Sequence, residues 1–303
     1  MAVLNAEFLA KLGTVKLRAR AVVEGLLSGL HRSPHQGQSV EFAEHKEYAP
    51  GDEIRHMDWK AFGKFDKYYI KRFEHETNLR AFVALDASAS MNYRSGAMSK
   101  LEVGATIAAA LSYLLVRQQD AVGLAVMHGE RIDFLPPRAA AGQLNLILDR
   151  LERLRGEGAT DLSGLADFLS EKARRRAAVY LISDLFDENE EALRRLLQLT
   201  HRNNELVLFH VLDPAEIDFP FEDNTQFLSM EDARSLQANP REIRRSYLEI
   251  FGQFLAGVRK SCVEWDVDYA LVRSDAPLDR ALLRFLARRL GRPGSGVALE
   301  ALG

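Results

Sequence analysis

The sequence predicts an α/β protein whose mostly parallel sheet is doubly wound, with helices on both faces. Beyond residue 78, continuous apolar segments of strand length alternate with longer segments of amphipathic, helical spacing. A strand that is apolar at nearly every position must be buried on both faces, which is typical of a parallel sheet covered by helices on each side. The length of 303 residues allows one large domain, or one domain with a smaller attachment.

The first part of the chain, residues 1–78, is predicted to hold a helix and a small antiparallel β element. Apolar residues recur with helical spacing over residues 5–30, and the helix is expected to break near Gly13. We expect this helix to dock on the main body, because it carries too few basic residues for a membrane surface. Residues 40–48 and 66–76 are rich in aromatic and β-branched side chains and flank a turn, so they are interpreted as paired strands.

The second part, residues 79–290, carries the alternating elements of the main domain. Buried strands are predicted at residues 79–86, 121–128, 177–184, 205–212 and 267–274, with an edge strand at 131–136 and a short strand at 225–231. Helices are predicted at residues 100–118, 141–154, 161–176, 188–202, 240–264 and 277–290. The last residues, 291–303, have the composition of a loop and are predicted to be a flexible tail.

The bulk composition excludes several classes of protein. The net charge is −3, and the 40 basic and 43 acidic residues are well mixed, which argues against a nucleic-acid partner. The single cysteine, Cys262, allows no intrachain disulfide and is expected to be a core thiol. The N-terminus does not resemble a signal peptide, and no apolar run approaches the roughly 20 residues that span a bilayer. We therefore expect a cytoplasmic protein without direct membrane insertion.

Short oxygen-bearing side chains gather at the predicted strand ends. The first buried strand ends in Asp86, and Ser88 and Ser90 lie in the loop that follows it. A later buried strand ends in Asp184, and Thr160 lies in the loop before a predicted helix. Ligands of a doubly wound sheet bind at the carboxyl ends of the strands, near the point where the strand order reverses. We expect these three segments to meet there.

This set of side chains favours a hard cation. Carboxylate and hydroxyl oxygens suit Mg²⁺, or Mn²⁺, and histidine and cysteine are absent from all three segments. Two carboxylates, from Asp86 and Asp184, would roughly balance the charge of a divalent ion. Such an ion would remain able to accept another carboxylate from outside.

The same residues resemble the metal-ion-dependent adhesion site of von Willebrand factor A domains. The pattern of that site is Asp-x-Ser-x-Ser, then Thr, then Asp, and it matches Asp86, Ser88, Ser90, Thr160 and Asp184 in order. The resemblance implies that the two serines and Thr160 coordinate the ion and that Asp86 anchors it, directly or through water. It further implies that Asp184 balances charge from the next shell and that one position stays open for a partner's Asp or Glu carboxylate.

The upstream segment resembles the domain-of-unknown-function-58 family, and this resemblance covers about residues 30–290. The residues that carry it are Tyr48, Pro50, Gly51, Asp52, Arg55, Asp58, Trp59 and Lys60. Members of that family are bacterial or archaeal and are often linked to MoxR-type AAA+ ATPases. The resemblance therefore implies a role beside such an ATPase in chaperone-like assembly or metal insertion.

Other conspicuous residues have structural interpretations. Asp52, Arg55, Asp58 and Trp59 are expected to form a polar cluster that fastens the β element to the main domain. The five histidines before Leu79 fit no zinc motif and are interpreted as scattered surface or loop residues; they are His31, His35, His45, His56 and His75. Asp187 is interpreted as the N-cap of the helix after it.

Three functions remain open from the residues themselves. The first is a non-enzymatic, metal-dependent module that binds a partner protein. The second is a Mg²⁺-dependent phosphohydrolase that uses Asp86, although the second aspartate expected of such a site is replaced by Ser88. The third is a structural scaffold with an empty metal site. The sequence does not identify the partner, the client process or the oligomeric state.

Overall fold

The computed structural model describes residues 5–30, 45–47, 69–71 and 79–282, except residues 175, 190, 233 and 281. The chain divides into two compact units, one formed by His31–Asn78 and the other by Met1–Leu30 together with Leu79–Gly303. In the smaller unit, strands β1 (His45–Glu47) and β2 (Tyr69–Lys71) pair antiparallel. The predicted antiparallel pair is thus confirmed for these six residues.

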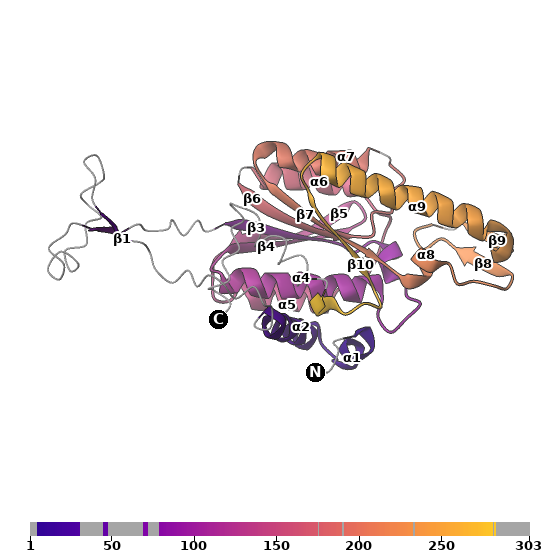
Figure 1. The fold of residues 1–303 in the computed structure, drawn as a ribbon, viewed down its shortest axis with the longest axis horizontal. Helices are drawn as coiled ribbons and strands as arrows, with labels where there is room; N and C mark the ends of the chain where they lie inside the picture. The colour runs from indigo at the N-terminus through magenta and orange to yellow at the C-terminus, as the bar shows by residue number, and fades with distance from the viewer. Residues whose placement is uncertain are drawn as a thin grey trace. The chain divides into compact units, whose positions relative to one another are not determined.

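The larger unit is built on a six-stranded sheet with the strand order β10-β7-β6-β3-β4-β5 (Figure 1). Its strands are β3 (Arg80–Asp86), β4 (Ala121–His128), β5 (Arg131–Arg138), β6 (Ala177–Ser183), β7 (Glu205–Leu212) and β10 (Asp268–Arg273). All neighbouring strands are parallel except β4 and β5, which pair antiparallel at one edge. The strand order reverses between the central strands β3 and β6. The predicted doubly wound, mostly parallel sheet is confirmed.

Helices cover both faces of this sheet (Figure 1). The α-helices are α1 (Ala6–Lys11), α2 (Val15–Leu30), α4 (Lys100–Arg117), α5 (Gln143–Glu152), α6 (Leu162–Lys172), α7 (Ala192–Leu197), α8 (Pro214–Asp218) and α9 (Pro240–Glu264), and the 3-10 helices are η2 (Ala89–Asn92) and η3 (Gln198–Arg202). Successive side chains of a strand point to opposite faces of the sheet. In β3, Val83 and Leu85 therefore lie in the core under α4 and α5. Phe82 and Ala84 lie in the core under α6 and α7, on the other face.

The two N-terminal helices dock on α4 and α5, as the sequence predicts, and the break between them falls at Gly13. Leu9, Val22 and Leu26 are fully buried in the core that they share with α4. The predicted division at residue 78 grouped this segment with the β element. The structure corrects that grouping for residues 1–30, because their apolar face packs on the larger unit.

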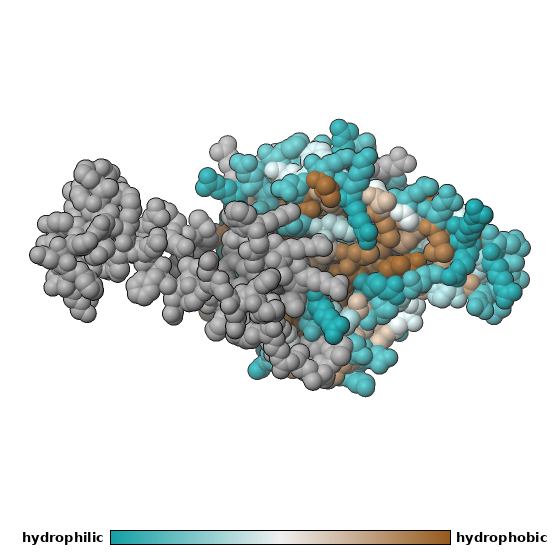
Figure 2. All heavy atoms as spheres, viewed as in Figure 1, coloured by the Kyte–Doolittle hydropathy of each residue, from teal (hydrophilic) through white to brown (hydrophobic). Residues whose placement is uncertain are grey.

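Helix α9 is the longest described helix, with 25 residues. It begins with Pro240, whose missing N–H is no loss at that position. It buries Phe251, Val258 and Cys262, so the expected core thiol is confirmed. On the face shown in Figure 2, hydrophobic residues form a band beside this helix, bordered by polar ones.

A β-hairpin between α8 and α9 was only half predicted. Strand β8 (Thr225–Leu228) corresponds to the expected short strand, but it pairs with β9 (Ser235–Ala238), which the sequence did not reveal. The four residues of β9, Ser-Leu-Gln-Ala, are largely exposed and include no β-branched or aromatic side chain, and an alternation over only four residues is weak evidence for a strand. The short helix α8 was also missed, because five residues carry too little periodicity.

Other predictions lie partly beyond the described residues. The closing helix predicted at 277–290 is described only as far as residue 282, with Leu278 and Leu282 buried in the core. The tail at 291–303 is outside the described part. Among the helices that the structure describes, none combines the length and the apolar character needed to cross a bilayer.

Because α2 docks on the larger unit, the loss of stability on shortening a leucine side chain to alanine should depend on which face of the helix carries it. Leu26 is 1 % exposed, so Leu26→Ala should lower the free energy of unfolding by about 2–5 kcal/mol, through lost burial and a cavity. Leu17 lies on the same helix and is 50 % exposed, so Leu17→Ala should change it by less than about 0.5 kcal/mol. Urea unfolding of both variants measures the difference. Equal costs would show that α2 is not docked.

Candidate functional site

The candidate site lies at the carboxyl ends of β3 and β6, the two central strands. Leu85 of β3 is level with Ile182 of β6, so Asp86 leaves the sheet beside Ser183. From β3 the chain runs into η2 and α4 on one face of the sheet, and from β6 it runs toward α7 on the other. Diverging connections of this kind open a crevice at the point where the strand order reverses.

Asp86 is buried at the bottom of this crevice. Its Oδ1 accepts a hydrogen bond from the Ser88 N–H at 2.9 Å, and its Oδ2 accepts one from the Ser183 hydroxyl at 2.6 Å. Burial and the charge of nearby Asp184 raise the pKa of Asp86 to about 7, although the hydrogen bonds from Ser183 and Ser88 act in the opposite direction. Two buried carboxyl groups this close together favour a cation between or beside them.

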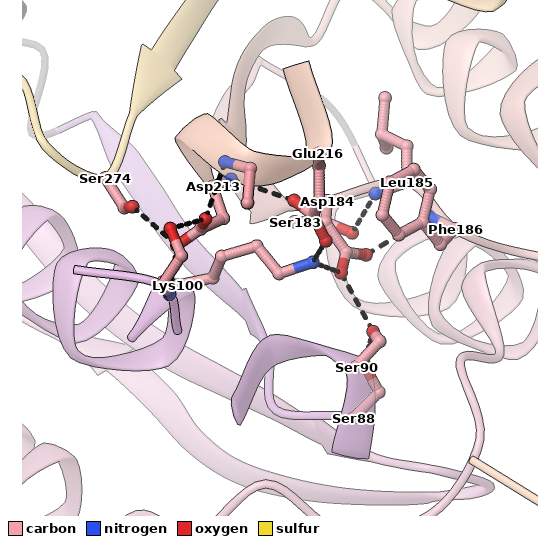
Figure 3. Close-up of polar contacts among 12 residues, drawn as sticks. Ser88, Ser90, Lys100, Ser183, Asp184, Leu185, Phe186, Asp213, Glu216 and Ser274 are labelled. Carbon is pink, nitrogen blue, oxygen red and sulfur yellow. Dashed lines mark hydrogen bonds and ion pairs between the residues drawn. The ribbon is translucent and has the colours of Figure 1, made fainter. Parts of the chain in front are cut away.

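Two hydroxyl groups connect this region to Asp184 (Figure 3). The hydroxyl oxygens of Ser88 and Ser90 lie 3.1 Å apart, and the Ser90 hydroxyl donates to Asp184 Oδ2 at 2.8 Å. Ligands at right angles around Mg²⁺, with bonds of about 2.1 Å, are about 3 Å apart. The two spacings, Ser88 to Ser90 and Ser90 to Asp184, are ordinary hydrogen-bond lengths and are also compatible with neighbouring corners of a magnesium octahedron.

Lys100 is the main member of the site that the sequence analysis missed. Its ammonium group, fully buried, donates to Asp184 Oδ2 at 2.7 Å and to Glu216 Oε1 at 2.5 Å. It also lies 4.7 Å from the centre of the Phe186 ring. Burial by itself would lower the pKa of Lys100, but the charges of Asp184 and Glu216 outweigh it, and the pKa is raised.

One sequence signal could have revealed Lys100. It is the first residue of α4 and lies between the two residues of the capping box, Ser99 and Glu102. The N-terminal end of a helix carries partial positive charge, so a cation there is unfavourable unless acidic groups compensate. A lysine at that position of an otherwise apolar helix indicates carboxylates from elsewhere in the chain.

Asp213 and Glu216 tie this charge cluster to the rest of the sheet. Glu216 and Asp213 form the capping box of α8, at the end of β7. Asp213 Oδ2 also accepts hydrogen bonds from the Ser95 N–H at 3.0 Å and the Ser274 hydroxyl at 3.2 Å. The loops after β3, β7 and β10 are therefore joined through one buried carboxylate (Figure 3).

The loop that carries Thr160 lies against the loop of the serines. The Glu157 N–H donates to the Ala87 carbonyl at 2.9 Å, and the Ala89 N–H donates to the Gly158 carbonyl at 2.8 Å. The Thr160 side chain itself donates to a carboxylate oxygen of Glu231, at 2.7 Å. The structure thus links Asp86, Ser88, Ser90 and Asp184 through hydrogen bonds and places the loop of Thr160 beside them, with its hydroxyl on Glu231.

Neighbouring acidic residues cap helices. Asp161 is the N-cap of α6 and accepts a hydrogen bond from the Gly164 N–H at 2.8 Å. Asp187 was expected to cap the helix after it, but α7 begins only at Ala192. Asp187 instead accepts a hydrogen bond from the Leu162 N–H at 2.8 Å, so it supports the start of α6 from across the site.

The imidazole of His210 lies behind Asp184. Its Nε2 is 2.9 Å from the Asp184 carbonyl oxygen, and its Nδ1 is 2.9 Å from the Tyr269 hydroxyl. Because a carbonyl can only accept, Nε2 carries the proton. Burial lowers the pKa of His210 to about 4, so the ring is neutral near pH 7 and holds the backbone at the end of β6.

A groove of about 650 Å³ opens beside the site, between α9, the loop after β6 and the tip of the β8–β9 hairpin. Apolar side chains dominate its walls, among them Phe186, Met230, Ile250 and Phe254. Its charged lining residues are Asp187, Glu188, Glu216, Glu231, Lys100 and Arg234. Acidic residues outnumber basic ones in this lining, so the groove carries an excess of negative charge.

The remaining predictions concern acidic and histidine side chains that could bind a metal. Among the residues described, no three His, Cys, Asp or Glu side chains are grouped so that they could hold a metal ion. A cation at the strand ends would therefore depend on serine and threonine oxygens as well as on aspartates. The side chains of the five histidines before Leu79 and the predicted cluster at residues 52–59 lie outside the described residues.

Comparison with protein families gives one clear match. The sequence model of the family described as "Protein of unknown function DUF58" matches residues 44–251. Uncharacterised proteins of Mycobacterium bovis and Mycobacterium tuberculosis are each 25 % identical to this chain over 214 residues, which make up 70 % of this chain and 67 % of theirs. The family that the upstream residues resembled is confirmed.

Solved structures show weaker similarity. The conserved hypothetical protein BatB from Bacteroides thetaiotaomicron is 16 % identical, with a TM-score of 0.43 over 69 % of this chain and 98 % of its own. The VWA domain of SpRpn10 is 12 % identical, with a TM-score of 0.39 over 73 % of this chain and 98 % of its own. At these values neither structure bears on the function of this chain.

The buried charge cluster predicts a large cost for removing Lys100. Lys100→Met leaves Asp184 and Glu216 without their counter-charge, so the free energy of unfolding should fall by about 3–5 kcal/mol without added divalent cation. Lys260→Met is the matched control, because Lys260 is 78 % exposed and lies 3.9 Å from Glu264 on α9. It should leave the urea midpoint nearly unchanged. A Lys100→Met protein as stable as the control would contradict the role of this ion cluster.

Proposed function

Because this chain belongs to the family described as protein of unknown function, DUF58, we propose its function from the chemistry of the site itself. The protein is a non-enzymatic binding module that holds a divalent cation, Mg²⁺ or Mn²⁺, and captures a carboxylate of a partner protein. Its ligand set is Asp86, Ser88, Ser90, Thr160 and Asp184. The observation that carries the proposal is the line of oxygens from Ser88 through Ser90 to Asp184, spaced as an octahedral ion requires.

The charges around the site fit a divalent ion. The Asp86, Asp184 and Glu216 carboxylates and the Lys100 ammonium group leave two negative charges in excess when all are ionised. When bound, the cation would supply an open coordination position for an Asp or Glu side chain. Asp184 and Asp86 hold the site near neutrality, while the serines and Thr160 contribute oxygens without further charge.

The negative charge of the groove is consistent with partner capture that requires a metal ion. Its lining carries more acidic than basic groups, so an acidic segment would be repelled there without a cation. A bound divalent ion would reverse the local charge and offer the acidic segment a direct ligand position. Chelation should therefore abolish binding while the fold persists.

The proposed partner is inferred from the family resemblance of the upstream segment. The resemblance of the upstream segment suggests a MoxR-type AAA+ ATPase, or a protein on which it acts, in the chaperone-like assembly or maturation of protein complexes in the cytoplasm. The balanced charge of the chain, −3 in total, offers no basis for a nucleic-acid partner.

The environment of Asp86 argues against the phosphohydrolase alternative. A nucleophilic carboxylate needs an oxygen that faces the substrate. Asp86 is 0 % exposed, and each of its oxygens already accepts a hydrogen bond, one from Ser88 and one from Ser183. Asp86 is therefore placed to organise its loop and to anchor the proposed ion through water, and not to attack a substrate.

Metal binding predicts a gain in stability. Mg²⁺ at about 100 times its dissociation constant should raise the free energy of unfolding by about 2.7 kcal/mol, because it binds only the folded protein. Asp86→Asn and Ser90→Ala should each reduce this gain, and Glu188→Gln, which changes a 78 % exposed side chain outside the ligand set, should keep it. Thermal unfolding with Mg²⁺ or EDTA measures the effect. An unchanged melting temperature in Mg²⁺ would favour the scaffold with an empty site.

Partner capture is predicted to follow metal occupancy. Immobilised wild-type protein should retain an AAA+ ATPase or its client from the native host when Mg²⁺ is present, and lose it in EDTA. Asp86→Ala should retain neither, whereas Glu264→Gln, which changes a 57 % exposed side chain outside the groove lining, should behave as wild type. Mass spectrometry of the retained proteins, with their amounts compared across the four samples, is the measurement. Equal recovery by Asp86→Ala and wild type would refute the mechanism.

A further inference from the structure

The β8–β9 hairpin reaches the candidate site from a firmly packed base. The Phe227 ring of β8 stacks on Phe219, with ring centres 5.8 Å apart, and Phe219 in turn packs on Tyr247 of α9 at 4.4 Å. The tip, residues 229–234, extends from this base to the loop of Thr160. The hairpin can therefore move its tip without losing its attachment.

The tip places the Glu231 carboxylate against Thr160, one of the proposed metal ligands. Glu231 Oε1 accepts a hydrogen bond from the Thr160 hydroxyl at 2.7 Å, and Oε2 accepts one from the Thr160 N–H at 3.1 Å. These two residues are 71 positions apart in the sequence. A carboxylate from the chain itself thus lies where the proposed function places the carboxylate of a partner.

The other contact that joins the tip to the main body is exposed. Arg234 pairs with Glu188 in the loop after β6, but their side chains are 71 % and 78 % exposed. Exposed ion pairs contribute little to stability. Leu228 and Met230 of the hairpin are also 66 % and 43 % exposed, so the tip buries little apolar surface. Little holds the tip in place apart from the bonds of Glu231 to Thr160.

The sequence of the tip shows which chemistry the groove accepts. Met230 lines the groove beside Phe186, Ile250 and Phe254, while the adjacent Glu231 reaches Thr160. An apolar side chain followed directly by a carboxylate therefore spans both parts of the surface, the groove and the metal site.

We propose that the hairpin tip is an internal ligand: Glu231 covers the carboxylate position at Thr160 until a partner segment displaces it. This inference rests on the proposed function. The displacing segment presents a large apolar residue next to an Asp or Glu, as Met230 and Glu231 do in the chain itself. The apolar residue enters the groove, and the acidic one takes the ligand position that Glu231 leaves.

A peptide copied from the tip tests this inference. The probe is fluorescein-labelled FLSMED, residues 227–232, and its binding is followed by fluorescence anisotropy in Mg²⁺ and in EDTA. The proteins are wild type, Glu231→Gln, Glu231→Ala and the matched control Glu264→Gln, which changes an exposed side chain that pairs with Lys260 on α9 and does not line the groove. The same peptide with glutamine in place of its one glutamate reports binding that does not need the glutamate carboxylate.

The expected result is tighter binding when the internal ligand is removed. Because Glu231 is tethered to the chain, it competes with the peptide at an effective concentration of roughly millimolar. Removal of this competitor should strengthen peptide binding about tenfold or more. Glu231→Gln and Glu231→Ala should both show this gain in Mg²⁺ and lose it in EDTA, and neither should bind the glutamine peptide. Glu264→Gln should bind like wild type.

Three outcomes would overturn the inference. Equal affinity of wild type and both Glu231 variants would make Glu231 a structural clasp, with the proposed function intact if binding still needs Mg²⁺. A more than tenfold loss of Mg²⁺ affinity in the variants, without peptide binding, would make Glu231 a permanent metal ligand. Absence of peptide binding in every protein would also refute the internal ligand, and the separate measurement of Mg²⁺-dependent stabilisation then decides whether the proposed function fails with it.

Discussion

The buried ion pair between Lys100 and Asp184 is the constraint on which the site depends. An ammonium group with no access to water is tolerated only when carboxylates surround it closely, and here Asp184 and Glu216 do so from β6 and α8. The same oxygen of Asp184 also accepts the hydroxyl of Ser90. The lysine therefore holds the Asp184 carboxylate in the orientation in which it accepts the hydrogen bond from Ser90.

The fold turns this local constraint into a rigid arrangement. The central strands β3 and β6 set Asp86 beside Ser183, the residue before Asp184, and backbone hydrogen bonds join the Thr160 loop to the loop of the serines. Asp213 joins the loops after β3, β7 and β10 from behind. Oxygen ligands held on strand ends and short loops lose little conformational freedom on binding, which favours an ion that demands strict geometry.

The two halves of the surface around the site differ in how firmly they are held. The sheet side is buried and bound by several hydrogen bonds to each group. The hairpin side is exposed, anchored by aromatic packing at its base and by a few polar contacts at its tip. Under the proposed function, an ion site next to a displaceable hairpin tip would let a partner be selected by two features at once, a carboxylate and a neighbouring apolar side chain.

The sequence by itself determined the doubly wound sheet and the identity of the oxygens at its strand ends. Both are local signals: buried strands are continuous apolar runs, and Asp86, Ser88, Ser90 and Asp184 directly follow such runs. Tertiary structure alone decided that Lys100 and Glu216 meet and that Glu231 reaches Thr160, because these partners are far apart in sequence. It also decided that β9 pairs with β8, because four exposed residues without β-branched or aromatic side chains give little sign of a strand. It also placed residues 1–30 on the larger unit, since helical spacing shows which face is apolar but not which surface will bury it.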